Sequence, residues 1–263
     1  MFTINNNKVG SDSQNGNNIF KDDNMVCISK AGQYSVYEHK RDLSVTPEYA
    51  EIAYFASEMN VRKRQLLVEM NNTSTTIQAG AMQWMLGNIS MSSGVNAGNF
   101  LGKALSAKVT GESVSKPIYS GNGLLMLEPT YKHIIMLDVG NWGSIVLQDG
   151  LFLACDSTLQ QKVVARNNVS SAVLGGEGLF NLCLSGQGIA VLESPVPQTE
   201  LIQFNLQDDV VKIDGNMAIA WSGSLNFTVE KSSKSLLGSA VSGEGLVNVY
   251  RGTGCILMAP TAK

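Results

Sequence analysis

Three glutamates recur at nearly constant spacing and could bind a cation if the fold brought them together. They are Glu112, Glu177 and Glu244, separated by 177 − 112 = 65 and 244 − 177 = 67 residues. A ring of carboxylates around a pseudo-threefold axis would offer a cation hard oxygen ligands. The alternative is a turn glutamate that accepts hydrogen bonds from nearby backbone N–H groups. We favour this alternative because no further oxygen ligands cluster beside the glutamates in the sequence.

The other chemistry-bearing residues match no catalytic or cofactor motif. The chain has two histidines, His39 and His133, and neither has a second ligand at metal spacing. We expect His39 in a solvated loop and His133 at a surface or strand edge. The sequence lacks GxSxG and GxxxxGK[ST], and Gly243-Glu244-Gly245 does not complete a dinucleotide fingerprint. We therefore predict no catalytic or cofactor-binding residue, no metal site beyond the three less favoured glutamates, and a protein that is not an enzyme.

A period of about 65 residues organises the chain. Gly121-Asn122-Gly123-Leu124 returns as Gly186-Gln187-Gly188-Ile189 and as Gly252-Thr253-Gly254-Cys255, with spacings of 186 − 121 = 65 and 252 − 186 = 66. Each Gly-x-Gly leads into an apolar, strand-like tail. Such regularity indicates one structural unit used three times. We interpret the glycines as residues at positive φ or at bulges, since a strand context does not suit a phosphate loop.

Each copy is predicted to begin with a strand and a glycine-centred hairpin. The opening strands are expected at residues 66–70, 133–139 and 201–206, and the hairpin glycines are Gly80, Gly150 and Gly215. Asp149-Gly150 and Asp214-Gly215 favour type I′ turns, in which both central residues have positive φ. About six short strands per copy are expected, a pattern typical of sandwiches and barrels.

The repeat assigns the cysteines to packing. None of the four forms a CxxC pair, which excludes a metal ribbon of that type. Cys155, Cys183 and Cys255 stand where the other copies have mostly apolar residues, so we expect buried, inert thiols. Disulfides are not expected in a reducing compartment.

The N-terminal quarter lies outside the repeat. We expect a flexible arm over residues 1–24, an extension over 25–64, and repeats over 65–129, 130–195 and 196–263. The extension contains a strand-like segment, Val26–Glu38, and a short amphipathic helix at about residues 47–58. Pro47 would begin this helix, with Thr46 as its N-cap.

Composition limits the partners. Charged residues make up 16% of the chain and the formal net charge is −3, which argues against a general nucleic-acid binder. The basic run Arg62-Lys63-Arg64 lacks interleaved aromatic residues and is interpreted as the solvated start of the first repeat strand. Trp84 and Trp221 are expected in core or interface packing. No membrane-length apolar stretch or targeting signal is visible, so a cytoplasmic location is expected.

The ordered landmarks resemble a known family. They are Gly111-Glu112-Ser113, Gly175–Phe180, Ser242–Val247, Ala79–Met82 and Gln148–Ala154. Together they are similar to the mitochondrial-biogenesis family named after altered inheritance of mitochondria, in its bacterial branch of uncharacterised members. The resemblance covers about residues 65–260. It implies a fold like that of the tryptophan RNA-binding attenuation protein and assembly into rings or other oligomers; the family supplies no agreed catalytic residues.

These observations combine into one prediction. The chain is expected to be all-β, with three β-sandwich or short double-stranded β-helix units similar to the attenuation protein and one short N-terminal helix. The favoured function is a non-enzymatic, homo-oligomeric scaffold or protein-interaction module. The alternative is a binder of a small ligand or an RNA segment at clefts between repeats or subunits, with RNA less favoured. No cofactor and no membrane span are expected.

Overall fold

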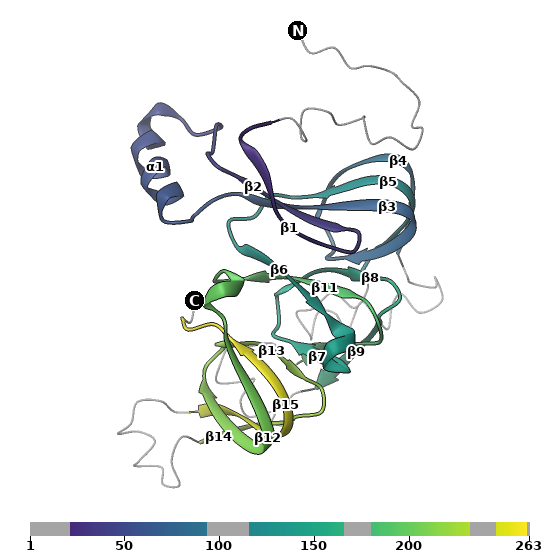
Figure 1. Cartoon of the computed structure of the whole chain (residues 1–263), viewed down its shortest axis with the longest axis vertical. Helices are drawn as coiled ribbons and strands as arrows, with labels where there is room; N and C mark the ends of the chain where they lie inside the picture. The colour runs from purple at the N-terminus through teal and green to yellow at the C-terminus, as the bar shows by residue number, and fades with distance from the viewer. Residues whose placement is uncertain (1–21, 94–115, 166–179, 232–245, 262–263) are drawn as a thin grey trace, which may run out of the picture. The chain divides into compact units, whose positions relative to one another are not determined.

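The computed structural model describes residues 22–93, 116–165, 180–231 and 246–261, which are mostly β-strand with one α-helix (Figure 1). The all-β prediction is therefore confirmed. The chain forms two compact units. The first is built from Met1–Thr73, Met82–Ser90 and Ser120–Lys132, and the second from Ser74–Ala81, Met91–Tyr119 and His133–Lys263. The repeat boundaries expected from the sequence stay predictions.

The first unit begins with a hairpin. The segment Val26–Glu38, expected as one strand, is two antiparallel strands that reverse at Gly32, which has a φ of 56°. The third strand, β3 (Arg64–Ile77), pairs with β2 (Tyr34–His39), the second strand of the hairpin. It also pairs with β5 (Ile118–Leu127), and β5 pairs in turn with β4 (Met82–Ser92). Tyr37, Leu67 and Met126 form one cluster of its buried core, and Trp84 packs against them. The strands are β1 (Met25–Ala31), β2 (Tyr34–His39), β3 (Arg64–Ile77), β4 (Met82–Ser92) and β5 (Ile118–Leu127).

The second unit contains the remaining strands in two sets. In one set β8 pairs with the last residues of β3 and with β11, which pairs with β6; in the other the order is β12-β15-β13-β7-β10-β9, with β14 on β15. Trp221 is 2% exposed and packs with Phe227 and Tyr250, so its core assignment is confirmed. The strands are β6 (His133–Asp138), β7 (Ser144–Leu147), β8 (Phe152–Asp156), β9 (Gln160–Ala165), β10 (Phe180–Ser185), β11 (Ile189–Ser194), β12 (Ile202–Asp214), β13 (Ala218–Ser222), β14 (Asn226–Lys231) and β15 (Leu246–Met258).

The three glycine-centred turns are not hairpins. Gly80, Gly150 and Gly215 have φ values of 81°, 75° and 51°, but Asp149 and Asp214 are not at positive φ. The type I′ prediction is therefore wrong, and positive φ at the second central residue alone is the pattern of a type II turn. The strands before and after each turn do not pair with each other. In each copy the last strand instead lies between the first strand of the copy and the strand that follows the turn. That strand is β5 between β3 and β4, β11 between β6 and β8, and β15 between β12 and β13.

Six short strands per copy are found only in the middle copy of the described chain. There a 3-10 turn, η4 (Val139–Trp142), separates β6 from β7. In the outer copies pairing continues through one residue at positive φ, Asn72 in β3 (52°) and Asp208 in β12 (51°). Each donates its backbone N–H to the middle residue of a Gly-x-Gly, Asn72 to Asn122 Oδ1 at 2.8 Å and Asp208 to Thr253 Oγ1 at 3.0 Å. These bonds let a long strand bend without breaking.

The Gly-x-Gly segments are close backbone contacts. Apart from Gly254, their glycines have φ values between 112° and 152°, which confirms the positive-φ interpretation for them. A Cβ on the second glycine would meet the strand that follows the type II turn in every copy. The contacts are with the Leu86 carbonyl oxygen at Gly123, the Asp156 side chain at Gly188 and the Ser222 side chain at Gly254. The Gly-x-Gly repeat therefore marks the same kind of packing contact at three places in the chain.

The cysteines are all free and differ in burial. Cys155 is fully buried, as expected, and burial raises the pKa of its thiol to about 12. Cys183 and Cys255 are only partly buried, and burial raises the pKa of each. Cys27 is exposed.

Candidate functional site

The cation site predicted from the sequence stays a prediction. Glu112, Glu177 and Glu244 lie outside the described residues. His39 ends β2 instead of lying in a solvated loop, because β1–β2 pairing continues to it and its Nε2 lies 3.0 Å from Gln65 Oε1. His133 is the first residue of β6. Within the described ranges no group of His, Cys, Asp and Glu could hold a metal ion.

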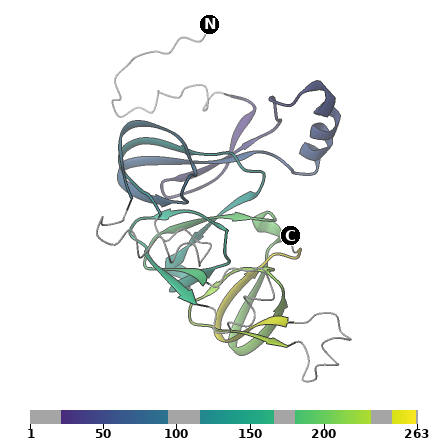
Figure 2. The same ribbon diagram turned by 180° about the vertical axis from the view of Figure 1, so that it is seen from behind.

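The feature that stands out is a helical arm, residues 40–63, between β2 and β3. Figures 1 and 2 show α1 standing off the strands of its own unit. The predicted helix at 47–58 is confirmed as a 3-10 turn, η2 (Pro47–Tyr49), followed by α1 (Ala50–Glu58). Thr46 makes no side-chain capping bond, which corrects the N-cap prediction; its hydrogen bond to Glu48 instead lowers the pKa of that carboxyl.

The C-terminus of α1 is closed by backbone hydrogen bonds. Val61 N–H donates to Ala56 O at 2.9 Å and Asn60 N–H donates to Ser57 O at 3.1 Å, while Asn60 has a φ of 64°. These two bonds and the left-handed residue make a Schellman motif with asparagine in the usual glycine position. The helix therefore ends at a fixed place and turns back toward β3.

The basic run at the end of the arm is an anchor. Arg62 Nη1 pairs with Glu38 Oε1 at 3.1 Å, and Arg64 Nη2 pairs with Glu38 Oε2 at 2.8 Å. Lys63 Nζ pairs with Asp42 Oδ1 at 2.8 Å. The prediction of a solvated basic run is wrong for Arg64, which is 1% exposed, because its guanidinium also donates to Asn60 Oδ1 at 2.6 Å. All three side chains of the basic run therefore form ion pairs that hold the arm.

The start of the arm is held by Asn24 and Asp42. The Asn24 side chain donates to Arg41 O at 2.9 Å and accepts from Arg41 N–H at 3.0 Å. Asp42 accepts hydrogen bonds from Lys63, Ser44 and Tyr131, the last at 2.7 Å. The bonds from Lys63 and Ser44 hold the pKa of Asp42 well below its usual range, and the bond to Asp42 raises the pKa of Tyr131. Sequence spacing gave no sign of this network, because Tyr131 is 89 residues from Asp42.

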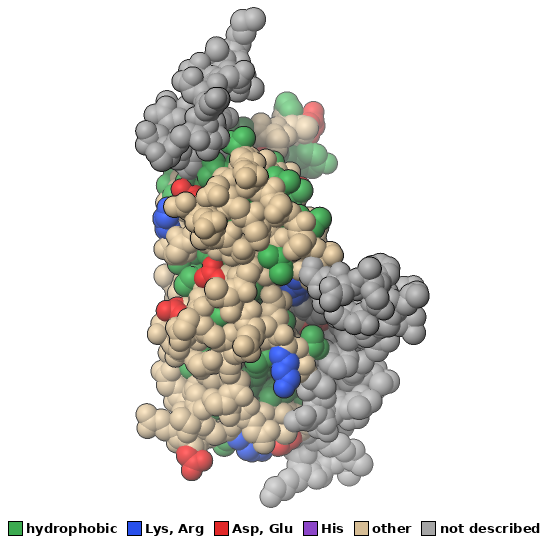
Figure 3. Space-filling view, turned by 90° about the vertical axis from the view of Figure 1, so that its right-hand side faces the viewer, with side chains coloured by type: hydrophobic (Ala, Val, Ile, Leu, Met, Phe, Trp, Pro, Cys, Tyr) green, Lys and Arg blue, Asp and Glu red, His purple; other side chains and the backbone are tan. Residues whose placement is uncertain are grey.

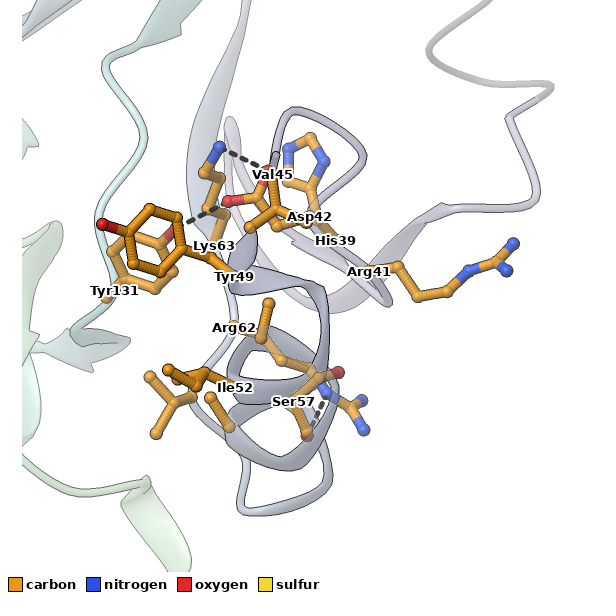
Figure 4. Close-up of a pocket in the computed structure, with 13 residues that line it drawn as sticks. His39, Arg41, Asp42, Val45, Tyr49, Ile52, Ser57, Arg62, Lys63 and Tyr131 are labelled. Atoms are coloured by element: carbon orange, nitrogen blue, oxygen red, sulfur yellow. Dashed lines mark hydrogen bonds and ion pairs between the residues drawn. The ribbon is translucent and has the colours of Figure 1, made fainter. Parts of the chain in front are cut away.

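A pocket of about 270 Å³ lies between α1 and the base of the arm (Figure 4). Its apolar wall comes from the arm, and its polar side carries the Asp42–Lys63 pair and Tyr131. Arg41 points away from the pocket in Figure 4. The apolar lining residues are Val45, Tyr49, Ile52, Ala53, Ala56 and Val61.

The pocket offers little covalent chemistry. Its Ser57 hydroxyl donates to Lys40 O at 2.8 Å, and His39 contacts Gln65, so the ring is not paired with a serine nucleophile. A nucleophilic site needs its base within hydrogen-bond reach of the nucleophile. The arrangement suits binding better than catalysis.

The arm exposes many of its large apolar side chains. No residue of η2 or α1 is buried. Ile52, Phe55 and Met59 are 67%, 59% and 78% exposed and lie at positions i, i+3 and i+7, which form one ridge. Tyr54 packs edge-on against Phe55 with ring centroids 5.5 Å apart. The sequence showed this amphipathic pattern, but an apolar stripe is normally read as the face that packs inward.

Comparison with known proteins gives a family match that begins near the end of the arm. Residues 58–261 match the family described as mitochondrial biogenesis AIM24. An uncharacterised protein of Streptococcus pyogenes serotype M6 is 31% identical over 190 residues, 69% of this chain and 74% of that protein. An X-ray crystal structure of a protein from Streptococcus pyogenes has a TM-score of 0.57 and 27% identity, covering 77% of this chain and 90% of that one. Most of the arm precedes the family match, which starts at Glu58. No helix in the described ranges is long and apolar enough to span a membrane.

Proposed function

This chain belongs to the mitochondrial biogenesis AIM24 family, and we propose that it is a non-enzymatic, oligomeric scaffold or protein-interaction module that docks through the helical arm. The observation that carries the proposal is the unburied apolar surface of α1. Contiguous exposed apolar surface on a folded protein usually marks a contact site, since leaving it in water forgoes the free energy of burial.

The anchoring of the arm supports docking. Its two ends are fixed by the Asn24 bonds at Arg41 and by the Arg64–Glu38 pair, and α1 ends in a closed cap. A partner that binds a preformed helix does not have to order it, so less conformational entropy is lost on binding. The apolar surface of the arm is therefore preformed for binding.

We also propose that the strands form three copies of one β-unit, related in fold to the tryptophan RNA-binding attenuation protein. Support comes from the recurring order in which the last strand of a copy lies between its first strand and the strand after its type II turn. The equivalent contacts of Gly123, Gly188 and Gly254 add to it. Three such units would account for the β-strands of the chain, the first of which follows the arm directly.

The test of docking compares one arm variant with a matched surface variant. Phe55→Glu charges the ridge, whereas Val210→Glu charges a 47% exposed site on β12. Both full-length proteins are used for affinity capture from native cells, and captured proteins are purified and titrated by calorimetry. We expect Phe55→Glu to lose binding at least tenfold and Val210→Glu to retain it, because a buried charge at a contact centre is costly. Equal binding by the two variants would refute the arm as docking element.

A second candidate function, binding of a small amphipathic ligand, is favoured by the pocket beside α1. Its apolar wall and its Asp42–Lys63 side suit a ligand with an apolar body and a polar end. Ala53→Trp would fill the pocket, and a ligand that raises the Tm of the wild type should then have no effect on the variant. RNA is not supported by the basic run, whose three members are ion-paired. On the face shown in Figure 3, basic and acidic side chains are sparse and scattered.

A further inference from the structure

We infer that the partner of the helical arm is the arm of a second copy of this chain, joined to it by a two-fold axis near Phe55. This inference rests on the proposed docking role of the arm and identifies the partner that binds there. Phe55 lies in the ridge between Ile52 and Met59, so two arms that cross at this residue would bring two identical ridges together. In such an isologous contact the same surface serves both partners.

The area on offer matches a stable dimer contact. Eight large apolar side chains of the arm are between 36% and 78% exposed. With about 150–250 Å² for an aromatic side chain and less for the others, they leave somewhat under about 1,000 Å² per copy in water. A standard interface buries about 800 Å² per partner, so an arm that brings most of these side chains into the contact supplies an area of that order. The eight residues are Leu43, Val45, Tyr49, Ile52, Tyr54, Phe55, Met59 and Val61.

The charges of the arm are complementary to themselves. The helix carries only acidic side chains, Glu48, Glu51 and Glu58, and the base of the arm carries exposed Lys40 and Arg41. Within the described part of the chain, none of these five takes part in an ion pair. A two-fold contact can bring the acidic helix of one copy toward the basic base of the other. A self-complementary charge pattern is what an isologous interface requires.

The acidic side chains of the helix argue against an anionic lipid surface as the partner of the arm. Helices that lie on membranes carry lysine and arginine on their polar face, opposite the apolar one. α1 carries no lysine or arginine, and its charged residues are Glu51 and Glu58. Repulsion from anionic headgroups would oppose insertion of the ridge, whereas a second copy offers Lys40 and Arg41 to these glutamates.

The first test measures the mass of the full-length protein by sedimentation. We expect a concentration-dependent assembly for the wild type and for Val210→Glu, with Phe55→Glu and Met59→Glu dissociating at least tenfold more readily. Circular dichroism and thermal unfolding establish that the variants stay folded. Raised salt should weaken the assembly, and Lys40→Glu/Arg41→Glu should reproduce that weakening at low salt.

The second test places the axis. In a Cys27→Ser background, Phe55→Cys should form an intermolecular disulfide on mild oxidation, and Val210→Cys should not. A monomeric wild type at all concentrations, or an assembly that Phe55→Glu and Met59→Glu leave unchanged, overturns the inference. If arm-dependent capture of another protein persists in either case, the docking role stands and only the second copy fails. Sedimentation of a monomer with vesicles of phosphatidylglycerol would instead identify a lipid surface as the partner.

Discussion

Arg64 and Glu38 form an ion pair at 2.8 Å in which the guanidinium side chain is 1% exposed and the carboxylate side chain 13% exposed. The same guanidinium donates to Asn60 O at 3.1 Å and to Tyr131 O at 3.4 Å. One side chain therefore connects β2, the end of α1 and the segment after β5. The direction in which the arm leaves its unit depends on this residue.

Replacement of Arg64 by methionine should cost about 1–3 kcal/mol of unfolding free energy, because Glu38 loses its closest partner in a partly buried place and keeps only Arg62. Urea unfolding of the full chain measures it. The double variant Arg64→Met/Glu38→Gln should recover part of the loss, since the carboxylate that lost its closest partner is gone. A single variant within about 0.5 kcal/mol of the wild type would contradict the assigned role.

The stabilising contribution of Asp42 should disappear in acid. Its folded pKa lies below the ordinary 3.8, so the ionised form stabilises the fold above that pH and the contribution is lost as pH falls through the lowered value. The difference in unfolding free energy between wild type and Asp42→Asn should be positive near neutral pH and shrink below about pH 3.8. Tyr131→Phe, which removes one of the donors, should show a smaller difference. A difference that does not change with pH would exclude the network as its cause.

The backbone contact at Gly123 should tolerate no side chain. A Cβ there would overlap the Leu86 carbonyl oxygen, and the φ of 149° is itself unfavourable for alanine. We expect Gly123→Ala to lower the unfolding free energy by more than about 2 kcal/mol. Gly215→Ala is the matched control: its φ is 51° but its Cβ would meet open space, so about 1 kcal/mol is expected. Equal losses of unfolding free energy in the two variants would show that backbone conformation, and not the contact with Leu86, is the reason for glycine at position 123.

The thiols should differ sharply in reactivity. Cys27 is exposed, so a neutral alkylating reagent should modify it first, and Cys27→Ser should abolish the fast phase. Cys155 should stay unmodified up to about pH 10, because it is buried and its thiol pKa is raised to about 12. Mass spectrometry after timed alkylation identifies each site. Fast labelling of Cys155 in the folded protein would contradict its place in the core.

The fold was predictable where local pattern and tertiary environment agree. Strand periodicity, the helix after Pro47 and the glycines at positive φ follow from steric limits that act within a few residues. The turn at Asp149-Gly150 was wrongly predicted because the prediction considered only such local limits. Its local preference is a type I′ hairpin, but which strand comes to lie beside β7 depends on residues far along the chain. The site was less predictable, because the bond from Tyr131 to Asp42 joins positions 89 residues apart.

The amino-acid sequence by itself determined the all-β class, the family and the spacing of the Gly-x-Gly contacts, since these depend on residue type and order. Tertiary structure decided which polar residues are paired and which apolar residues are left in water. Arg64 looks like a solvated cation in the sequence and is buried in the fold. The ridge of Ile52, Phe55 and Met59 looks like a core face and is exposed. Burial is a property of what the rest of the chain places around a side chain, and no local pattern contains that information.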